Sequence, residues 1–199
     1  MIPLLLAASL LATPRIAETV AVGAEAPNFT LTDINGKAHN LTDFRGKYVV
    51  LEWTNEGCPF VIKHYSTQNM QSAQKKATDM GAVWLSIVSS APGKQGHITP
   101  ETGKALFKRA GFKSTALLID EDGAVARQFK AKTTPHMYVI DPKGVLRYMG
   151  AIDDRATPQP EDVKGAKNYV LSALTELMAG KDVSVTATQP YGCSVKLKN

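Results

Sequence analysis

Residues 48–59 read YVVLEWTNEGCP, and this stretch decides the fold. Its first six residues, Tyr48 to Trp53, form an apolar, β-branched run that is typical of a central strand covered on both faces. Residues 54–57 read as a loop, and Pro59 stands where the first turn of a helix tolerates proline. The sequence therefore predicts a buried strand that leads through a short loop into a helix, with Cys58 at the junction.

Cys58 gains chemical significance from this position. The first turn of a helix carries unpaired N–H groups and the positive end of the helix dipole, and both favour the nucleophilic thiolate over the thiol. We expect Lys63 and His64 to add positive potential, although His64 can equally be a surface residue. A buried inert thiol is the alternative, but such a residue has no need of a Gly-Cys-Pro frame at a helix mouth. The pattern favours a reactive Cys58.

The pattern outside this stretch alternates between strands and helices. Asn35-Gly36 signals a tight turn between residues 29–33 and 37–41 and predicts a β-hairpin. Further strands are expected at 82–88, 115–120, 136–141 and 145–153, and helices at 59–80, around 103–111, within 121–131 and at 161–178. This order predicts an α/β, thioredoxin-like sandwich: a central mixed sheet, helices on both faces, the N-terminal β-hairpin and a final pair of antiparallel edge strands.

Composition and charge exclude several classes of protein. The 199 residues suit one domain, and 44% hydrophobic and 21% charged residues are normal for a globular chain. The net charge is +5, but lysine and arginine are scattered and not interleaved with aromatics, so nucleic-acid binding is not expected. Two cysteines, Cys58 and Cys193, are too few for a disulfide scaffold and too far apart in sequence for a typical zinc site.

The N-terminus predicts export. The apolar run from Ile2 to Ala12 has the length of a signal-peptide core and is too short to span a bilayer. No lysine or arginine precedes it, and Thr19-Val20-Ala21 offers small residues for cleavage before Val22. We expect a signal peptide at 1–21, a redoxin domain at 22–180 and a tail at 181–199. The protein would be periplasmic or extracellular without stable membrane insertion; a cytoplasmic protein with an apolar start is the alternative.

Three motifs in order resemble the redoxin superfamily, in the alkyl hydroperoxide reductase and thiol-specific antioxidant group. Residues 22–31, VGAEAPNFTL, resemble its N-terminal signature, and residues 44–51, FRGKYVVL, resemble the motif before the cysteine loop. Residues 134–144, TPHMYVIDPKG, resemble the segment that carries a cis-proline beside a thioredoxin active site. The resemblance covers about residues 22–177 and implies a thioredoxin fold.

Within this resemblance Cys58 takes the place of the first cysteine of a thioredoxin Cys-x-x-Cys, or equally of a peroxidatic cysteine. Pro135 takes the cis-proline position, where backbone of Thr134 would face a bound disulfide or peptide; an ordinary trans turn is the alternative. His136 is the other histidine expected near the site, and Glu56 is either a proton acceptor or a solvated loop residue. The residues expected to support the site are Thr54, Asn55, Glu56, Gly57, Pro59, Thr134 and Pro135.

Two departures from the family pattern limit what the resemblance implies. Val61 stands where thioredoxins have their second cysteine, so exchange within one motif is impossible. Typical peroxiredoxins carry Thr three residues before the cysteine and a later Arg, whereas this chain has Asn55 and no matching arginine, since Arg127 and Arg147 are both misplaced. One motif cysteine plus one tail cysteine resembles peroxiredoxin-like proteins with a GCPFV motif, here residues 57–61.

Cys193 lies in the tail sequence YGCSVK, residues 191–196, where Gly192 permits a sharp bend. Attack by Cys193 on an oxidised Cys58 would make it the resolving cysteine; a static disulfide and an unpaired tail cysteine are the alternatives. We expect a peroxiredoxin-like oxidoreductase that acts on a peroxide, uses an external thiol reductant and needs no cofactor or metal. Thiol–disulfide exchange on a protein disulfide, or copper(I) or peptide binding without turnover, are the alternatives.

Overall fold

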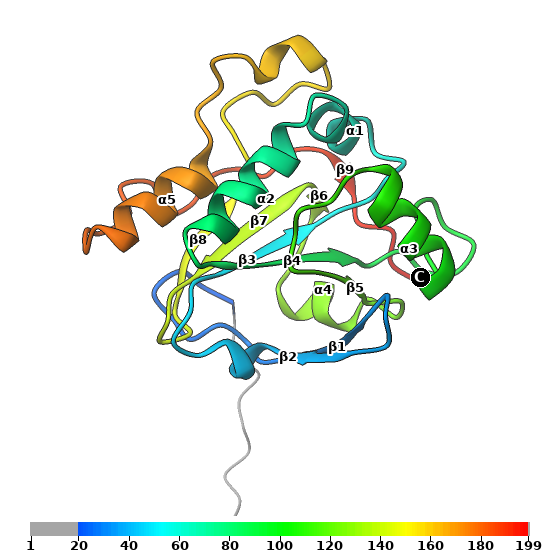
Figure 1. The fold of residues 1–199 in the computed structure, drawn as a ribbon, viewed down its shortest axis with the longest axis horizontal. Coiled ribbons are helices and arrows are strands. Elements are labelled where there is room, and N and C mark those ends of the chain that lie inside the picture. The colour runs from blue at the N-terminus through cyan, green and yellow to red at the C-terminus, as the bar shows by residue number, and fades with distance from the viewer. Residues whose placement is uncertain (1–19, 199) are drawn as a thin grey trace, which may run out of the picture.

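The computed structural model describes residues 20–198. Seven strands form one mixed sheet in the order β2-β1-β5-β4-β3-β7-β8, and helices cover both of its faces (Figure 1). The strands are β1 (Thr30–Asp33), β2 (Ala38–Asn40), β3 (Val49–Trp53), β4 (Val83–Val88), β5 (Ala116–Ile119), β7 (His136–Ile140) and β8 (Leu146–Gly150). Two further short strands, β6 (Thr133–Thr134) and β9 (Cys193–Ser194), pair with each other. The expected thioredoxin-like fold is confirmed.

Two apolar layers hold the helices on the sheet. The helices are α1 (Pro59–Ser66), α2 (Asn69–Asp79), α3 (Pro100–Arg109), α4 (Ala124–Gln128) and α5 (Tyr169–Met178). On one face Val50 and Trp84 pack against α2 and α5, while Leu51 and Trp53 on the other face pack against α4. Every residue of β3 is buried, as the apolar run at 48–53 predicts for a central strand.

The strand directions refine one expectation. Strands β3, β4 and β5 run parallel, β1 is antiparallel to β5, and β7 is antiparallel to β3. The last strand pair, β7 and β8, was predicted to lie at the edge of the sheet. Only β8 does so, because β7 hydrogen-bonds to β3 along its whole length and is an interior strand.

The prediction of one continuous helix at 59–80 is wrong. The segment divides into α1 and α2 because Gln68 adopts a left-handed conformation with φ 60°. The Thr67 hydroxyl also donates to the Lys63 carbonyl at 2.7 Å, which ends α1 with a side-chain bond. The break turns the chain so that α2 lies across the sheet while α1 stays beside the Cys58 loop (Figure 1).

Two other helix boundaries differ from the prediction. The last helix, expected from about residue 161, begins at Tyr169, where the Asn168 side chain accepts from the Leu171 N–H at 2.9 Å and caps it. Residues 160–163 form a separate 3₁₀ turn. Helix α3 begins at Pro100, earlier than expected, because Thr99 and Thr102 form a reciprocal capping box.

The tail after α5 returns across the molecule and docks on it (Figure 1). The Thr188 N–H donates to Met149 at the edge of β8, β9 pairs with β6, and the Val195 N–H donates to Lys132. Val195 and Leu197 then pack against the core that contains Trp53. Hydrogen bonds and apolar contacts therefore hold the chain against the folded domain on both sides of β9.

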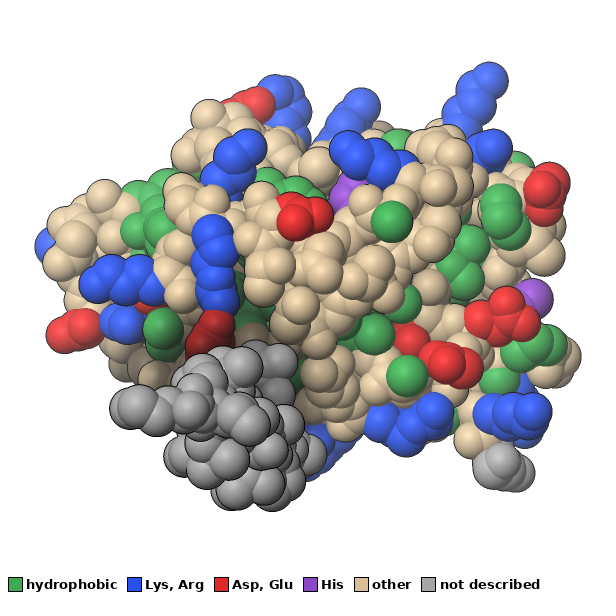
Figure 2. Space-filling model, turned by 90° about the horizontal axis from the view of Figure 1, so that it is seen from below, with side chains coloured by type: hydrophobic (Ala, Val, Ile, Leu, Met, Phe, Trp, Pro, Cys, Tyr) green, Lys and Arg blue, Asp and Glu red, His purple; other side chains and the backbone are tan. Residues whose placement is uncertain are grey.

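The predicted signal peptide lies almost entirely outside the described residues. Between residues 20 and 198, no helix has the length and apolar character needed to cross a membrane. On the face of the molecule drawn in Figure 2, basic and acidic side chains are interspersed and do not gather into a patch of one sign.

Candidate active site

Cys58 lies at the mouth of α1, directly before Pro59 at the first helical position. Its side chain is fully buried, and its Sγ donates to the Thr134 carbonyl oxygen at 3.0 Å. The Thr134–Pro135 peptide bond is cis, as expected from the sequence. The helix mouth and the segment before Pro135 thus meet at the Cys58 sulfur.

The loop before Cys58 is held by the segment that follows β4. The Asn55 side chain accepts from the Gly57 N–H at 2.9 Å and donates to the Gln95 carbonyl at 3.0 Å. The Gln95 side chain in turn donates to the Gly57 carbonyl at 2.9 Å. A Cβ on Gly57 would lie 2.7 Å from Cγ of Gln95, so glycine is needed for this approach. Thr54 is buried and extends the β3–β4 pairing through its N–H.

The tail brings Cys193 to the same place. Cys193 lies opposite Thr134 in the β6–β9 pair, and Thr134 is the residue whose carbonyl oxygen accepts from Sγ of Cys58. Both cysteines are free thiols in this structure. A Cβ on Gly192 would lie 2.1 Å from the Thr134 carbonyl oxygen, so the bend before Cys193 requires glycine. The chain's two cysteines, 135 residues apart in sequence, therefore form a dithiol pair.

The surroundings of the pair favour a thiolate on Cys58. Burial alone would raise its pKa, but hydrogen bonds from the Cys193 thiol and from the N–H groups of Cys193 and Val61 outweigh burial and lower it. The Thr134 side chain acts in the same direction. Burial, together with the hydrogen bond and the charge of Cys58, raises the pKa of Cys193 to about 11. The pKa of Cys58 is therefore the lower of the two, so Cys58 is the first of the pair to ionise.

His64 does not supply the positive charge that the sequence suggested, and Lys63 donates its hydrogen bond elsewhere. Both side chains are buried, and the Lys63 ammonium donates to the Arg155 carbonyl at 2.7 Å, away from Cys58. Burial, aided by the neighbouring Lys63 charge, lowers the pKa of His64 to about 3, so His64 is neutral. The expectation that His64 can be a surface residue is also wrong.

Other residues considered from the sequence are engaged elsewhere. Glu56 forms an exposed ion pair with Arg109, and His136 contacts the Tyr138 hydroxyl at 3.1 Å. Burial lowers the pKa of His136 to about 4, so it is neutral too. Arg127 donates to the Asp122 carbonyl, and Arg147 pairs with Asp141 and Asp182.

Comparison with known proteins decides the family. The model of the AhpC/TSA family matches residues 22–149, which is more than half of the chain. The chain belongs to the AhpC/TSA family. The resemblance of the three sequence motifs is confirmed at this level, and so is the expectation of an oxidoreductase.

Relatives of this AhpC/TSA protein include the "Thiol-disulfide oxidoreductase ResA" of Geobacillus kaustophilus, 27% identical over 135 residues, which cover 64% of this chain and 68% of that protein. An uncharacterised conserved protein from the same organism has a similar structure, with a TM-score of 0.74, 25% identity and coverage of 94% of this chain and 98% of that one. The structure of a hypothetical protein from Sinorhizobium meliloti is also similar, with a TM-score of 0.76 and 24% identity. The match covers 91% of this chain and 97% of that one.

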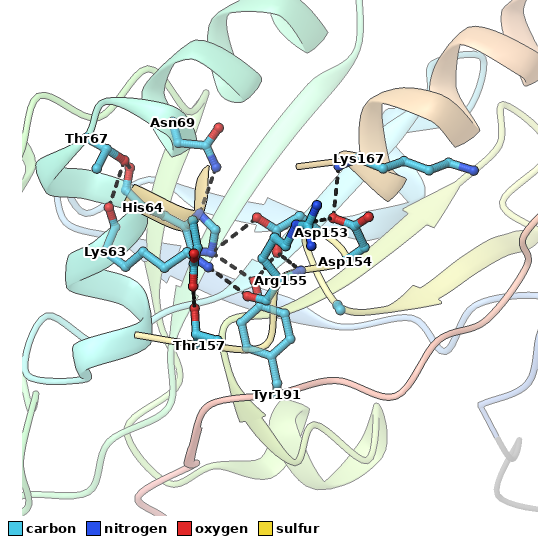
Figure 3. Close-up of polar contacts among 12 residues, drawn as sticks. Lys63, His64, Thr67, Asn69, Asp153, Asp154, Arg155, Thr157, Lys167 and Tyr191 are labelled. Carbon is cyan, nitrogen blue, oxygen red and sulfur yellow. Dashed lines mark hydrogen bonds and ion pairs between the residues drawn. The ribbon is translucent and has the colours of Figure 1, made fainter. Parts of the chain in front are cut away.

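Sequence reasoning missed two groups of polar residues that contact α1, the helix that begins after Cys58 in this AhpC/TSA protein. Tyr191, just before Gly192 in the tail, contacts His64 and Asp153 (Figure 3). Glu52 is fully buried in β3 and accepts hydrogen bonds from four side chains: Tyr65, Gln74, Trp84 and Ser86. An acidic residue inside the apolar run 48–53 was a readable signal for Glu52, whereas the contacts of Tyr191 depend on the path of the tail.

The chemistry available at this site is that of a dithiol. Within residues 20–198, no group of three or more His, Cys, Asp or Glu side chains is placed to hold a metal ion. A thiolate at a helix mouth beside a second thiol can form and break sulfur–sulfur bonds, because each sulfur can serve as nucleophile or leaving group.

Proposed function

We propose that this AhpC/TSA protein is a thiol–disulfide oxidoreductase that cycles between a Cys58/Cys193 dithiol and a Cys58–Cys193 disulfide. The observation that carries the proposal is the β6–β9 pairing, which holds Cys193 opposite Thr134, the residue whose carbonyl oxygen accepts from Sγ of Cys58. The name of the ResA relative supports exchange chemistry over peroxide reduction. Cys193 then replaces the second cysteine that Val61 removes from the motif.

In the first step the Cys58 thiolate attacks one sulfur of a substrate disulfide. A bond forms between Cys58 and that sulfur, the substrate's own sulfur–sulfur bond breaks, and the other substrate sulfur leaves as a thiolate that takes up a proton. Cys58 is fully buried beneath the tail, so β9 has to separate from β6 for the substrate to reach it. The pairing is only two residues long, which makes local opening inexpensive.

In the second step Cys193 attacks the Cys58 sulfur of the mixed disulfide and expels the substrate's remaining thiolate. The substrate has then gained two electrons, and the protein has lost two in forming the Cys58–Cys193 bond. Once Cys58 is in a mixed disulfide it carries no charge, so two of the causes that raise the pKa of Cys193 disappear. Cys193 becomes easier to ionise at the moment when it is needed. An external thiol reductant restores the dithiol.

The remaining site residues position this pair in the proposed mechanism. Asn55 and Gly57 fix the loop, Pro59 starts the helix, and Thr54 continues the strand, while Thr134 and Pro135 present the backbone on which Cys193 docks. Glu56 lies at the rim, paired with Arg109. None of these roles requires a charged base, because the surroundings of Cys58, Cys193 among them, already lower its pKa.

Peroxide reduction, the first expectation from the sequence, has less support. Asn55 is bound to Gln95, and the contacts of Arg127 and Arg147 are with residues outside the site. The groups that hold a peroxide in typical peroxiredoxins therefore have no counterpart among the contacts of the described residues. The chemistry of a sulfenic acid on Cys58 remains the second candidate because the same thiolate would perform it.

The test is stoichiometric oxidation followed by intact mass and peptide mapping. The reduced protein is mixed with oxidised glutathione in one arm and with hydrogen peroxide in the other. We expect the glutathione arm to give a Cys58–Cys193 peptide with loss of two hydrogens, and Cys193→Ser to accumulate a glutathione adduct on Cys58. Failure of Cys193→Ser to form the adduct, or turnover by Cys58→Ser, would refute the proposal. Faster reaction in the peroxide arm would favour the second candidate.

We also propose that the protein is exported and that residues 1–21 are its signal peptide. The apolar run at 2–12 and the small residues before Val22 support this. Amino-terminal sequencing of the protein after expression in its own cells tests it, because a mature chain that begins at Val22 is expected and one that retains Met1 contradicts export by cleavage.

A further inference from the structure

Tyr191 lies within a directed chain of hydrogen bonds that runs from Asn69 to Asp153 (Figure 3). The Asn69 side-chain N–H₂ donates to Nδ1 of His64 at 2.7 Å, so Nδ1 is an acceptor and the ring proton of neutral His64 is on Nε2. Nε2 lies 3.1 Å from the Tyr191 hydroxyl and donates to it. The hydroxyl in turn donates to Oδ1 of Asp153. His64 and Tyr191 therefore each accept one hydrogen bond and donate one.

The partners of Tyr191 are fixed parts of the folded domain. His64 and Asp153 are buried, and Oδ1 of Asp153 also accepts from the Arg155 N–H at 3.0 Å. The Tyr191 ring packs against Phe60, with centroids 5.8 Å apart, and the Lys63 ammonium lies 5.6 Å from the ring centroid. Three of these contacts come from α1, the helix whose mouth carries Cys58. Tyr191 is therefore held by α1, the same helix that positions Cys58.

The chain between Tyr191 and Cys193 has little freedom. Gly192 is the one intervening residue, and its close approach to the Thr134 carbonyl fixes the path on that side. Two residues of chain reach about 7 Å at most, so anchoring Tyr191 confines Cys193 to a small volume around Cys58. The β6–β9 pair by itself holds two residues and is too short to be stable alone.

We propose that Tyr191 is a positioning residue that sets the effective concentration of Cys193 at Cys58, through its hydrogen bonds to Asp153 and His64. This inference rests on the proposed function, because it concerns the step in which Cys193 closes the disulfide. The anchor keeps Cys193 close while β9 opens and closes, so that an intramolecular thiol outcompetes an external one. A tail cysteine without this anchor would lose part of that advantage.

The test is the equilibrium between the Cys58–Cys193 disulfide and glutathione, since the ratio of reduced to oxidised protein in defined glutathione buffers measures effective concentration. We expect Tyr191→Phe to lower the effective concentration about five- to tenfold, because the variant loses the hydroxyl that bonds to Asp153 and His64. Tyr191→Ala, which also loses the ring contacts, should lower it by more than Tyr191→Phe. Asp153→Asn keeps an acceptor oxygen and should stay closer to the parent protein than Asp153→Ala.

Tyr48→Phe is the matched control, because it also removes a tyrosine hydrogen bond, the one to the Leu177 carbonyl at 3.1 Å, on α5. It should leave the glutathione equilibrium unchanged. Equal values for Tyr191→Phe, Tyr48→Phe and the parent protein would overturn the inference. In a Cys193→Ser background, Tyr191→Phe should still form the glutathione adduct on Cys58. If the adduct is lost in Cys193→Ser alone, the proposed function fails instead, so the two failures are distinct.

Discussion

Thr134 is bound by both cysteines: its carbonyl oxygen accepts from Sγ of Cys58 at 3.0 Å, and Cys193 lies opposite it in the β6–β9 pair. One backbone residue therefore sets the positions of two sulfur atoms that belong to distant parts of the chain. The edge of β6 is occupied by the protein's own tail. A substrate that approaches Cys58 in an extended form has to compete with that tail for the same edge.

The first prediction concerns the ionisation of Cys58. The rate of alkylation by iodoacetamide follows the thiolate fraction, so it rises with pH and levels off above the pKa. Because hydrogen bonds from Cys193 help to lower the pKa of Cys58, we expect the parent curve to rise at lower pH than the curve of Cys193→Ala. Peptide mapping assigns the label to Cys58. Superimposed curves for the two proteins would show that Cys193 does not stabilise the thiolate.

The second prediction concerns Gly192. Alanine there would place its Cβ 2.1 Å from the Thr134 carbonyl oxygen at a φ of +129°, so β9 cannot keep its pairing with β6. We expect Gly192→Ala to slow closure of the Cys58–Cys193 disulfide at least about tenfold, the effect of losing about 1.4 kcal/mol of positioning energy. Rapid-quench mass spectrometry after mixing with oxidised glutathione measures the rate.

Gly180→Ala is the control for Gly192→Ala. Gly180 also has a positive φ of +69°, but a Cβ there meets nothing within 4 Å. The control thus carries the conformational strain without the collision at Thr134. If Gly180→Ala slows closure as much as Gly192→Ala does, general destabilisation rather than the close approach at Thr134 is responsible.

The sequence predicted the elements whose signals are local. The β-branched run at 48–53, the Asn35-Gly36 turn and Pro59 each act through the backbone of a few residues, and each led to the observed strand, hairpin and helix start. The break at Gln68 escaped notice because glutamine gives no warning of a left-handed conformation. Long-range contacts set it: Gln71 and Gln74 on α2 bond to Ala110 and Glu52.

The site residues also differ in whether local sequence or long-range contacts determine them. Cys58 and Pro135 were readable from motifs, and Cys193 was readable as a possible partner because the chain has no other cysteine. The charge expected on His64 was wrong because burial, which depends on the tail and on Asp153, lowers the pKa of this histidine to about 3. Tyr191 was unreadable for the same reason, since its partners lie 38 and 127 residues away.

The third prediction concerns Glu52, the buried acid of β3. Its carboxyl group accepts from four donors at 2.8–2.9 Å, and two of them, Tyr65 and Gln74, lie on the helices that flank the Gln68 break. Glu52→Leu leaves these donors without an acceptor and should cost about 3–5 kcal/mol in the free energy of unfolding. Glu52→Gln keeps one acceptor oxygen and should cost less. Urea denaturation measures both.

Asp79→Asn provides the comparison for Glu52. Asp79 pairs with Lys75 on the exposed face of α2, and such a pair contributes about 0.5 kcal/mol or less. The substitution should leave the urea midpoint close to that of the parent protein. A Glu52→Leu protein as stable as Asp79→Asn would mean that the four hydrogen bonds contribute nothing net to the fold.

The last prediction concerns the two buried neutral histidines, His64 and His136. Burial lowers their pKa values to about 3 and about 4, whereas the unfolded chain has a histidine pKa of about 6.5. Between these values the unfolded state binds protons that the native state does not, so stability falls as pH falls below about 6.5. Each histidine contributes a slope that approaches about 1.4 kcal/mol per pH unit below pH 6. We therefore expect His64→Gln and His136→Gln each to flatten the dependence of unfolding free energy on pH between 6 and 5. Urea titrations at several pH values measure the slope, which is independent of any constant loss of stability caused by the substitution. A His64→Gln protein with the parent's slope would show that His64 is protonated in the native state, and the direction of its hydrogen bond to Tyr191 would then no longer depend on a neutral ring.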